Sequence, residues 1–160
     1  MRLSTKGRYA VMAMADLAQN EAGGRPVSLA DIAERQEISL SYLEQLFAKL
    51  RRGGLVGSVR GPGGGYRLSR PADELRVADI IMAVDEPISA TRCKLGSAKG
   101  CSGQGGRCIT HDLWEELGHQ IHVFLSSVSL ADVVEKRVLG RAQLGVQQGD
   151  SESGGDRAAA

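Results

Sequence analysis

Three cysteines and one histidine are the residues of this sequence that could hold an inorganic centre. They follow the pattern Cys93-x7-Cys101-x6-Cys108-x2-His111, and the chain has no other cysteine. Five glycines lie among them and make the segment flexible enough to wrap around one centre. Thiolates favour iron-sulfur clusters, zinc and Cu(I), and a four-ligand set suits a 2Fe-2S cluster. Structural zinc sites usually contain a tight Cys-x2-4-Cys pair, which is absent here, but spacing alone leaves zinc and a cluster equally open.

The composition limits the other classes of function. With 160 residues, of which 42% are hydrophobic and 4% aromatic, the chain can bury one modest core but has few rings for stacking bases. No stretch approaches the roughly 18 apolar residues of a membrane helix, and an odd number of cysteines without a secretion signal fits reduced thiols. We therefore expect a cytoplasmic protein. No acid-base pair, nucleophile-base arrangement or cofactor-binding loop indicates an enzyme.

The net charge of +1 conceals a difference between the two halves. Residues 1–70 hold 11 Lys and Arg against 6 Asp and Glu, whereas residues 71–160 hold 9 against 13. The first half is therefore the better place for a polyanion. The excess is moderate, so an ordinarily solvated surface is the alternative on charge alone.

The basic half has the layout of a helix-turn-helix. Apolar residues recur at helical spacing between Tyr9 and Ala18, and the pattern stops before Pro26. A short second helix follows the Ser28 cap, and a third begins at the capping-box pattern of residues 41–44 and closes at Gly53. Helical hairpins are also common in ordinary cores, so this pattern alone leaves DNA binding open.

A glycine-rich hairpin follows the third helix. Residues 55–59 and 66–69 are predicted to be strands, joined by the sequence Arg-Gly-Pro-Gly-Gly-Gly. Such a tip can bring backbone N–H groups close to phosphates, and Arg60 at its base can enter a narrow minor groove. The tip lacks the Gly-Lys-Ser/Thr ending of a nucleotide-binding loop, and a plain surface hairpin is the alternative.

The second half contains a brief apolar helix at residues 78–84 and a long helix from His111. In the long helix, four apolar residues alternate three and four positions apart, as in a helix that meets another helix. We expect this stripe to form a dimer interface, although it could instead pack on its own domain. The stripe consists of Trp114, Leu117, Ile121 and Phe124.

Three stretches of the basic half, MRLSTKGRYA, ISLSYLEQLF and VRGPGGGY, together with the cysteine segment, resemble the IscR family of bacterial iron-sulfur cluster regulators. The resemblance covers roughly residues 1–136, although both spacers between the cysteines are longer here than in the family. It implies a homodimer with one 2Fe-2S cluster per subunit, received from the iron-sulfur assembly machinery. Its ligands would be Cys93, Cys101, Cys108 and His111. It also implies that the loaded form represses iron-sulfur biogenesis genes, while the empty form still binds a second class of site.

The expected fold is mainly α with a small β-hairpin wing: a winged helix-turn-helix DNA-binding domain plus a long dimerisation helix. We assign residues 1–72 to the DNA-binding domain, 73–91 to a connecting helix region, 92–111 to the cluster loop, 112–136 to the dimerisation helix and a packing turn, and 137–160 to a disordered tail. A nitric-oxide or iron-responsive repressor of the same fold, and a zinc or iron-sulfur carrier or redox protein, are the alternatives.

In this fold the start of the third helix enters the major groove of a roughly palindromic site in double-stranded DNA. Glu44 can accept from cytosine N4 and is repelled by phosphates, so it can exclude sequences as well as select them. Lys49 and Arg51 are expected to neutralise phosphates. The predicted DNA contacts are Ser39, Ser41, Tyr42, Glu44, Gln45, Lys49, Arg51 and Arg60.

Overall fold

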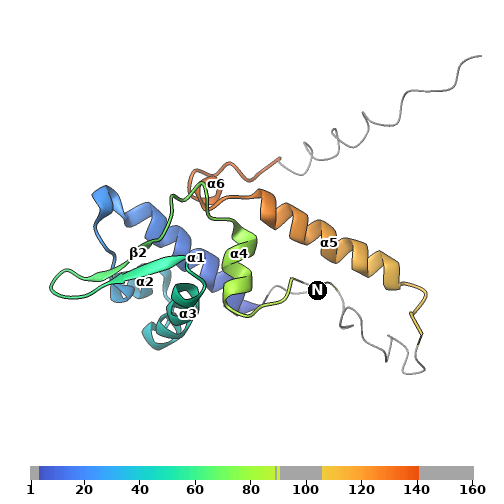
Figure 1. Ribbon diagram of the computed structural model, residues 1–160, viewed down its shortest axis with the longest axis horizontal. Coiled ribbons are helices and arrows are strands. Elements are labelled where there is room, and N and C mark those ends of the chain that lie inside the picture. Colours follow the sequence, from blue (N-terminus) through green and yellow to red (C-terminus); the bar gives the residue numbers. More distant parts are fainter. Residues whose placement is uncertain (1–3, 89, 91–105, 141–160) are drawn as a thin grey trace, which may run out of the picture.

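The protein consists of a helical body, a small hairpin and one projecting helix (Figure 1). The computed structural model describes residues 4–88, 90 and 106–140. Its helices are α1 (Thr5–Asn20), the 3-10 turn η1 (Ala22–Gly24), α2 (Leu29–Gln36), α3 (Leu40–Arg52), α4 (Val77–Ala83), α5 (His111–Ser127) and α6 (Leu130–Val134), and its strands are β1 (Val56–Val59) and β2 (Gly65–Leu68). The predicted fold class, mainly α with a hairpin wing, is confirmed.

Helices α2 and α3 form the helix-turn-helix, and serines begin both. Ser28 Oγ accepts from the backbone N of Asp31 at 3.1 Å, as the sequence predicts. Helix α3 begins after Ser39, whose Oγ accepts from the N of Tyr42 at 3.4 Å. The prediction that the helix begins at Ser41 is therefore wrong, because an earlier serine already satisfies the amides of the first turn.

The core lies between α1, α2, α3 and the segment around α4. Helix α3 is amphipathic and turns one apolar face into this core, which leaves its polar face for solvent. Among the fully buried side chains are Met14, Leu17, Ile32, Leu43, Leu46, Phe47, Leu50 and Ile80. Burial of the α3 face therefore fixes which side chains the helix exposes.

A buried carboxylate joins α1 to α2. Asp16 is 4% exposed, and it accepts from Arg35 Nη2 at 2.6 Å, Arg35 Nε at 3.0 Å and Gln36 Nε2 at 2.7 Å. Burial opposes ionisation of Asp16, but the hydrogen bonds from Arg35 and Gln36 outweigh it and lower the pKa of the carboxyl. This contact, the Asp16 clamp, sets how α2 sits on α1.

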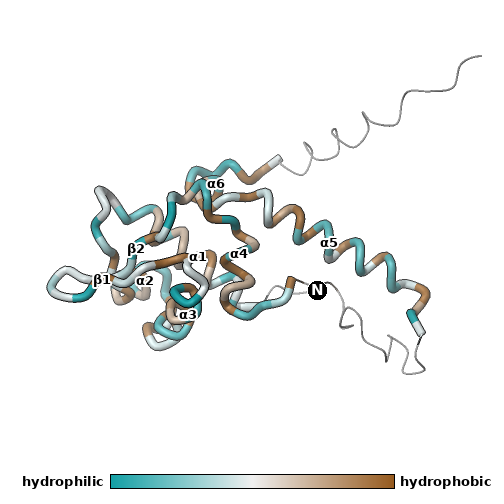
Figure 2. The backbone as a smooth tube through the Cα atoms, in the orientation of Figure 1, coloured by the Kyte–Doolittle hydropathy of each residue, from teal (hydrophilic) through white to brown (hydrophobic). Residues whose placement is uncertain are grey.

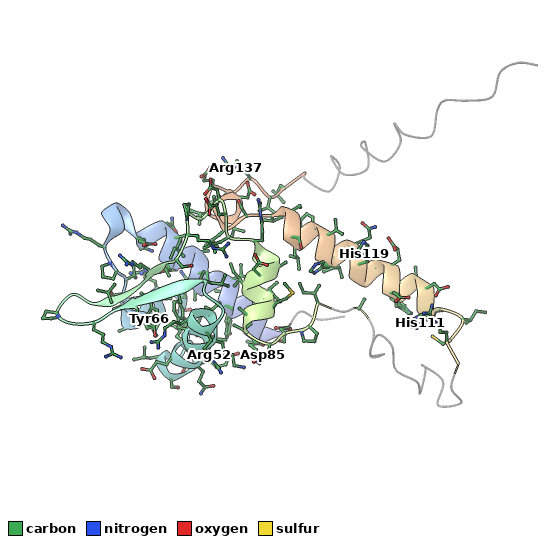
Figure 3. All side chains as sticks on the ribbon, in the orientation of Figure 1. Arg52, Tyr66, Asp85, His111, His119 and Arg137 are labelled. Atoms are coloured by element: carbon green, nitrogen blue, oxygen red, sulfur yellow. The ribbon has the colours of Figure 1, made fainter. Side chains whose placement is uncertain are left out.

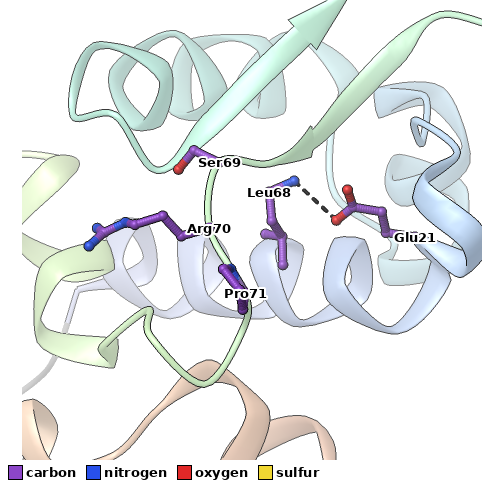
Figure 4. A pocket seen from close by; sticks show the side chains of 5 residues that line it. All are labelled: Glu21, Leu68, Ser69, Arg70 and Pro71. Carbon is purple, nitrogen blue, oxygen red and sulfur yellow. Dashed lines mark hydrogen bonds between the residues drawn. The ribbon is translucent and has the colours of Figure 1, made fainter.

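The hairpin is extended by a third segment from the start of α2. Strands β1 and β2 pair antiparallel, with Ser58 opposite Tyr66. On the other edge of β2, Val27 N donates to Tyr66 O and Tyr66 N donates to Val27 O, both at 2.8 Å. The N of Leu68 on this edge donates to Glu21 Oε2 at 3.0 Å, beside a shallow surface depression at the end of β2 (Figure 4). The backbone of β2 is therefore tied to the Glu21 carboxylate at the end of α1 and to the backbone of Val27 just before α2.

Gly65 is required where β2 passes the start of α2. A methyl group at this position would lie 2.9 Å from the N of Ser28 and closer still to the O of Val27. We expect Gly65→Ala to lower the free energy of unfolding by about 1–3 kcal/mol, because the backbone has to shift. Urea denaturation measures the loss. The control is Gly57→Ala, where a methyl meets nothing within 4 Å, and equal stability of both variants contradicts the prediction.

Helix α5 is held at its C-terminal end and projects from the body (Figure 1). Val77 N donates to Val128 O at 3.0 Å, and Leu130 N donates to Leu75 O at 2.8 Å. All residues of α5 are described, and Gly118 is the one that is buried. Figure 2 shows apolar residues along the whole projecting length. No helix in the described part of the chain is long and apolar enough to span a membrane.

Arg137, the first residue of the predicted tail, is bound to the body. Its backbone N donates to the O of Asp132 at 2.8 Å, and it lies beside α6 (Figure 3). Val138 packs against the apolar cluster of Val77, Ile81 and Val128. The predicted tail therefore begins with residues that contact the fold. Its remainder, from residue 141, lies outside the described residues.

Candidate nucleic-acid interface and metal centre

The first turns of α3 present an exposed polar face. Ser39, Ser41, Glu44 and Gln45, all predicted DNA contacts, are exposed. A protein that reads base edges needs hydrogen-bonding side chains on a helix that can enter the major groove. The structure places these four side chains together at the exposed start of α3.

Tyr42 belongs to the packing of α3 as well as to its exposed face. Its ring meets the ring of Tyr9 edge-on, with centroids 6.0 Å apart, and it is half-buried. The predicted DNA contact at Tyr42 therefore also links α3 to α1.

The wing is attached to α3 by side chains from both. The rings of Phe47 and Tyr66 lie 4.9 Å apart, and Arg51 Nη1 donates to Ser58 Oγ at 3.4 Å. Arg60, at the base of the tip, is exposed. The exposed Arg67 on β2 is a further cation of the wing that the sequence analysis did not select.

Lys49, a predicted phosphate contact, forms an ion pair within its own chain. Its Nζ lies 2.7 Å from Asp85 Oδ2, just after α4. The hydrogen bond with Asp85 raises the pKa of Lys49. No sequence signal indicated this ion pair, since 36 positions separate the two residues.

Glu86, which follows Asp85 in the chain, contacts the start of α1. It accepts from the backbone N of Ser4 at 2.6 Å and from the N of Gly7 at 2.7 Å. Burial opposes ionisation of Glu86, but the hydrogen bonds from Ser4 and Gly7 outweigh it and lower its pKa. A methyl group on Gly7 would lie 2.7 Å from Glu86 Oε2, so glycine leaves room for the carboxylate.

Two of the four predicted metal ligands lie at the outer start of α5 (Figure 3). His111 N donates to Cys108 O at 3.0 Å, so a single turn brings the thiol and the imidazole to the same end of the helix. Cys108 is a free, half-buried cysteine. A thiolate and an imidazole suit an iron-sulfur cluster or zinc, so the described donors fit the predicted centre. Cys93 and Cys101 lie outside the described residues.

A carboxylate orients the imidazole of His111. Nε2 of His111 lies 3.3 Å from Oε2 of Glu115, which is one turn further along α5. The His111 side chain is 14% exposed. Metal-bound histidines usually donate their second N–H to such an acceptor. Glu115 was not among the predicted site residues, although its i,i+4 spacing from His111 places the two side chains on one face of a helix.

The predicted dimer stripe divides into two parts. Phe124, near the end of α5, packs against the apolar cluster formed by Val77, Ile81 and Val128 of its own chain. Trp114, near the start, is 41% exposed. Leu117 and Ile121 between them are half-buried. The stripe thus packs on its own domain at one end, and the projecting end retains apolar surface.

Known proteins resemble the chain over most of its length. The family model Rrf2, iron-dependent transcriptional regulator, matches residues 3–136. The HTH-type transcriptional regulator IscR of Photorhabdus laumondii subsp. laumondii is 58% identical over 137 residues, which cover 86% of this chain and 81% of that protein. The structure of T. potens IscR has a TM-score of 0.67 at 40% identity and covers 89% of this chain and 91% of its own. The structure of CymR, the global cysteine regulator of B. subtilis, has a TM-score of 0.69 at 34% identity. The match covers 85% of this chain and 98% of the CymR chain.

Proposed function

The chain belongs to the Rrf2 family of iron-dependent transcriptional regulators and is of the IscR type, and from this premise we propose that a 2Fe-2S cluster controls which DNA it binds. The observation that carries the proposal is the combination, in one chain, of an exposed recognition face on α3 and a thiol-imidazole pair at the start of α5. The first suits base recognition, and the second suits a labile inorganic centre.

In the proposed complex, the exposed side chains of α3 contact bases in the major groove while the wing lies beside the backbone. Glu44 selects cytosine and excludes close phosphates, and Arg51 and Arg60 bind phosphates or a narrow minor groove. The Phe47–Tyr66 contact supports this arrangement, because it holds the wing and α3 in one position relative to each other.

Cys108 and His111, with Cys93 and Cys101, would hold the cluster, one per subunit, after its delivery by the iron-sulfur assembly machinery. The cluster supplies a centre whose presence reports iron-sulfur supply. Glu115, whose Oε2 lies 3.3 Å from His111 Nε2, would help to hold the imidazole in place for the centre. The loaded protein represses iron-sulfur biogenesis genes, and the empty protein keeps a second class of site.

The proposed homodimer forms through the projecting part of α5. Ile121→Asp is expected to weaken dimerisation about 100-fold or more, because a carboxylate would have to be buried against apolar side chains. Sedimentation equilibrium measures the change. His119→Asp is the control, since it adds the same charge at an exposed position of the same helix. Equal dimer affinities of the two variants contradict the assignment.

The proposed function is tested by anaerobic purification followed by visible spectroscopy and DNA binding. Duplexes are first selected from a random library, once by the loaded protein and once by the empty protein. We expect a coloured iron-sulfur protein whose DNA affinity falls with salt, with a slope of about −0.9 per phosphate contact. A colourless zinc protein, or identical duplexes selected by both forms, contradicts the proposal.

A further inference from the structure

Asp85 and Glu86 form an acidic turn that binds two helices of the DNA-binding domain just before the cysteine segment. Cys93 follows Glu86 by seven positions. We propose that this turn is a joint that transmits the state of the cysteine segment to α3 and α1, and hence to the DNA-binding face. The inference rests on the proposed function, because it requires that the segment binds a centre.

The first arm of the joint reaches α3. Asp85 pairs with Lys49 at 2.7 Å, with the Lys49 side chain 26% exposed and that of Asp85 73% exposed. Lys49 lowers the pKa of Asp85 most, and the charges of Lys6 and Arg52 add to this effect. Figure 3 shows Arg52 and Asp85 at the same end of α3. A single carboxylate thus neutralises part of a cationic group drawn from α1 and α3, and its displacement would change the charge presented by the recognition helix.

The ends of α3 and α4 are also close-packed beside this ion pair. A methyl group on Gly53, at the end of α3, would lie 3.1 Å from the Cβ of Ala83, at the end of α4. A shift of α4 or of the turn after it therefore presses directly on α3.

The second arm reaches the first turn of α1 through Glu86. Its carboxylate accepts the amides of Ser4 and Gly7, which the helix itself cannot satisfy. Helix α1 in turn contacts the recognition helix through the Tyr9–Tyr42 ring pair. Loss of the Glu86 contact would therefore loosen the start of α1 at the point where it supports α3.

Both ends of the cysteine segment lead to α4. On one side the chain runs directly from the acidic turn, which follows α4. On the other side α5 runs back from His111 to Val128, which is hydrogen-bonded to Val77 at the start of α4. His111 lies at the outer end of α5, far from the wing residue Tyr66 (Figure 3). Among the described residues, the acidic turn is thus the point where the chain leading to this segment contacts both α3 and α1.

The joint is tested by measuring how strongly cluster loading changes DNA affinity. The probe is a duplex selected by the loaded wild-type protein from a random library, titrated with loaded and empty protein. Two variants break the arms: Asp85→Asn, because Asn accepts the positive φ of 58° at this position, and Glu86→Ala. The control is Glu74→Ala, a carboxylate at an exposed position.

We expect a loaded-to-empty affinity ratio of about 5- to 150-fold in the wild type and in Glu74→Ala. The ratio should fall below about threefold in Asp85→Asn and Glu86→Ala, which should keep the visible spectrum of the wild type. If the wild type shows the expected affinity ratio and both variants retain it, the joint is wrong and the proposed function stands. A wild-type ratio near one overturns the proposed function and the joint with it.

Hydrogen exchange tests the joint without any variant. Loading the cluster should change the exchange rate of the Gly7 amide, which Glu86 protects, by at least about threefold. The amide of Leu46, in the buried middle of α3, should not change. If loading alters DNA affinity but leaves the Gly7 amide unaffected, the joint is wrong and the proposed function stands.

Discussion

Replacing Cys108 with alanine is expected to remove the visible absorption of the loaded protein and its preference for the loaded-form DNA. Without this thiolate, the centre lacks one of its proposed ligands. The expected loss of affinity for the loaded-form duplex is about 5- to 150-fold. This factor corresponds to the coupling free energy of about 1–3 kcal/mol that is typical between two linked binding sites. Affinity for the duplex selected by the empty protein should be unchanged. Gel-shift titrations on both duplexes, with absorption spectra of each preparation, measure these effects.

Cys101→Ala should have the same two effects, since Cys101 is a proposed ligand of the same centre. Ile109→Ala is a suitable control, because this side chain is fully exposed and next to Cys108 in sequence. The control should keep the spectrum and both affinities. Equal losses on the two duplexes in the cysteine variants would instead indicate that these residues support the fold or the dimer.

Asp16→Ala is expected to lower the free energy of unfolding by about 3 kcal/mol. The substitution leaves Gln36 and Arg35 without the carboxylate that they bind inside the helix-turn-helix. The effect lies at the lower end for a broken buried pair, because the Arg35 side chain is 39% exposed and water can solvate it. Urea denaturation measures the difference. Glu34→Ala, at an exposed position of α2, should change stability by less than about 0.5 kcal/mol.

The contribution of the Asp16 clamp should depend on pH. The pKa of Asp16 is lower in the folded protein than in the unfolded chain, where it is about 3.9. Its stabilisation is therefore fully present above the unfolded pKa and is lost as the pH falls through the folded pKa. The stability difference between wild type and Asp16→Ala should shrink below about pH 4. A difference that stays constant down to pH 2 would mean that the clamp acts through shape and not through charge.

The helix-turn-helix and the wing could be predicted from sequence because local residue types determine them. The Ser28 cap, the closure of α3 at Gly53 and the two strands follow from neighbours within a few positions. The start of α3 was missed, because Ser39 and Ser41 both suit a helix cap and only the folded chain selects between them.

The contacts of the acidic turn could not be predicted from sequence. Lys49 and Asp85 are 36 positions apart, and Gly7 and Glu86 are 79 apart, so no local pattern links them. Lys49 was predicted to neutralise phosphates because it lies with Arg51 in the basic last turn of α3. The four metal ligands, in contrast, were proposed from residue type and spacing, and for all four that assignment stays a prediction.

The backbone pairing of Val27 with Tyr66 separates the hairpin into a fixed base and an exchangeable tip. Gly65 and Tyr66 are held against the start of α2, whereas residues 60–64 extend beyond this attachment. Changes in the length or composition of the tip can therefore leave the helix-turn-helix folded. In the proposed complex, transplanting this five-residue tip between relatives should change the groove contact of the wing and leave the proposed base contacts of α3 unchanged. The proposed wing contact and the proposed base contacts can thus be varied separately in this chain.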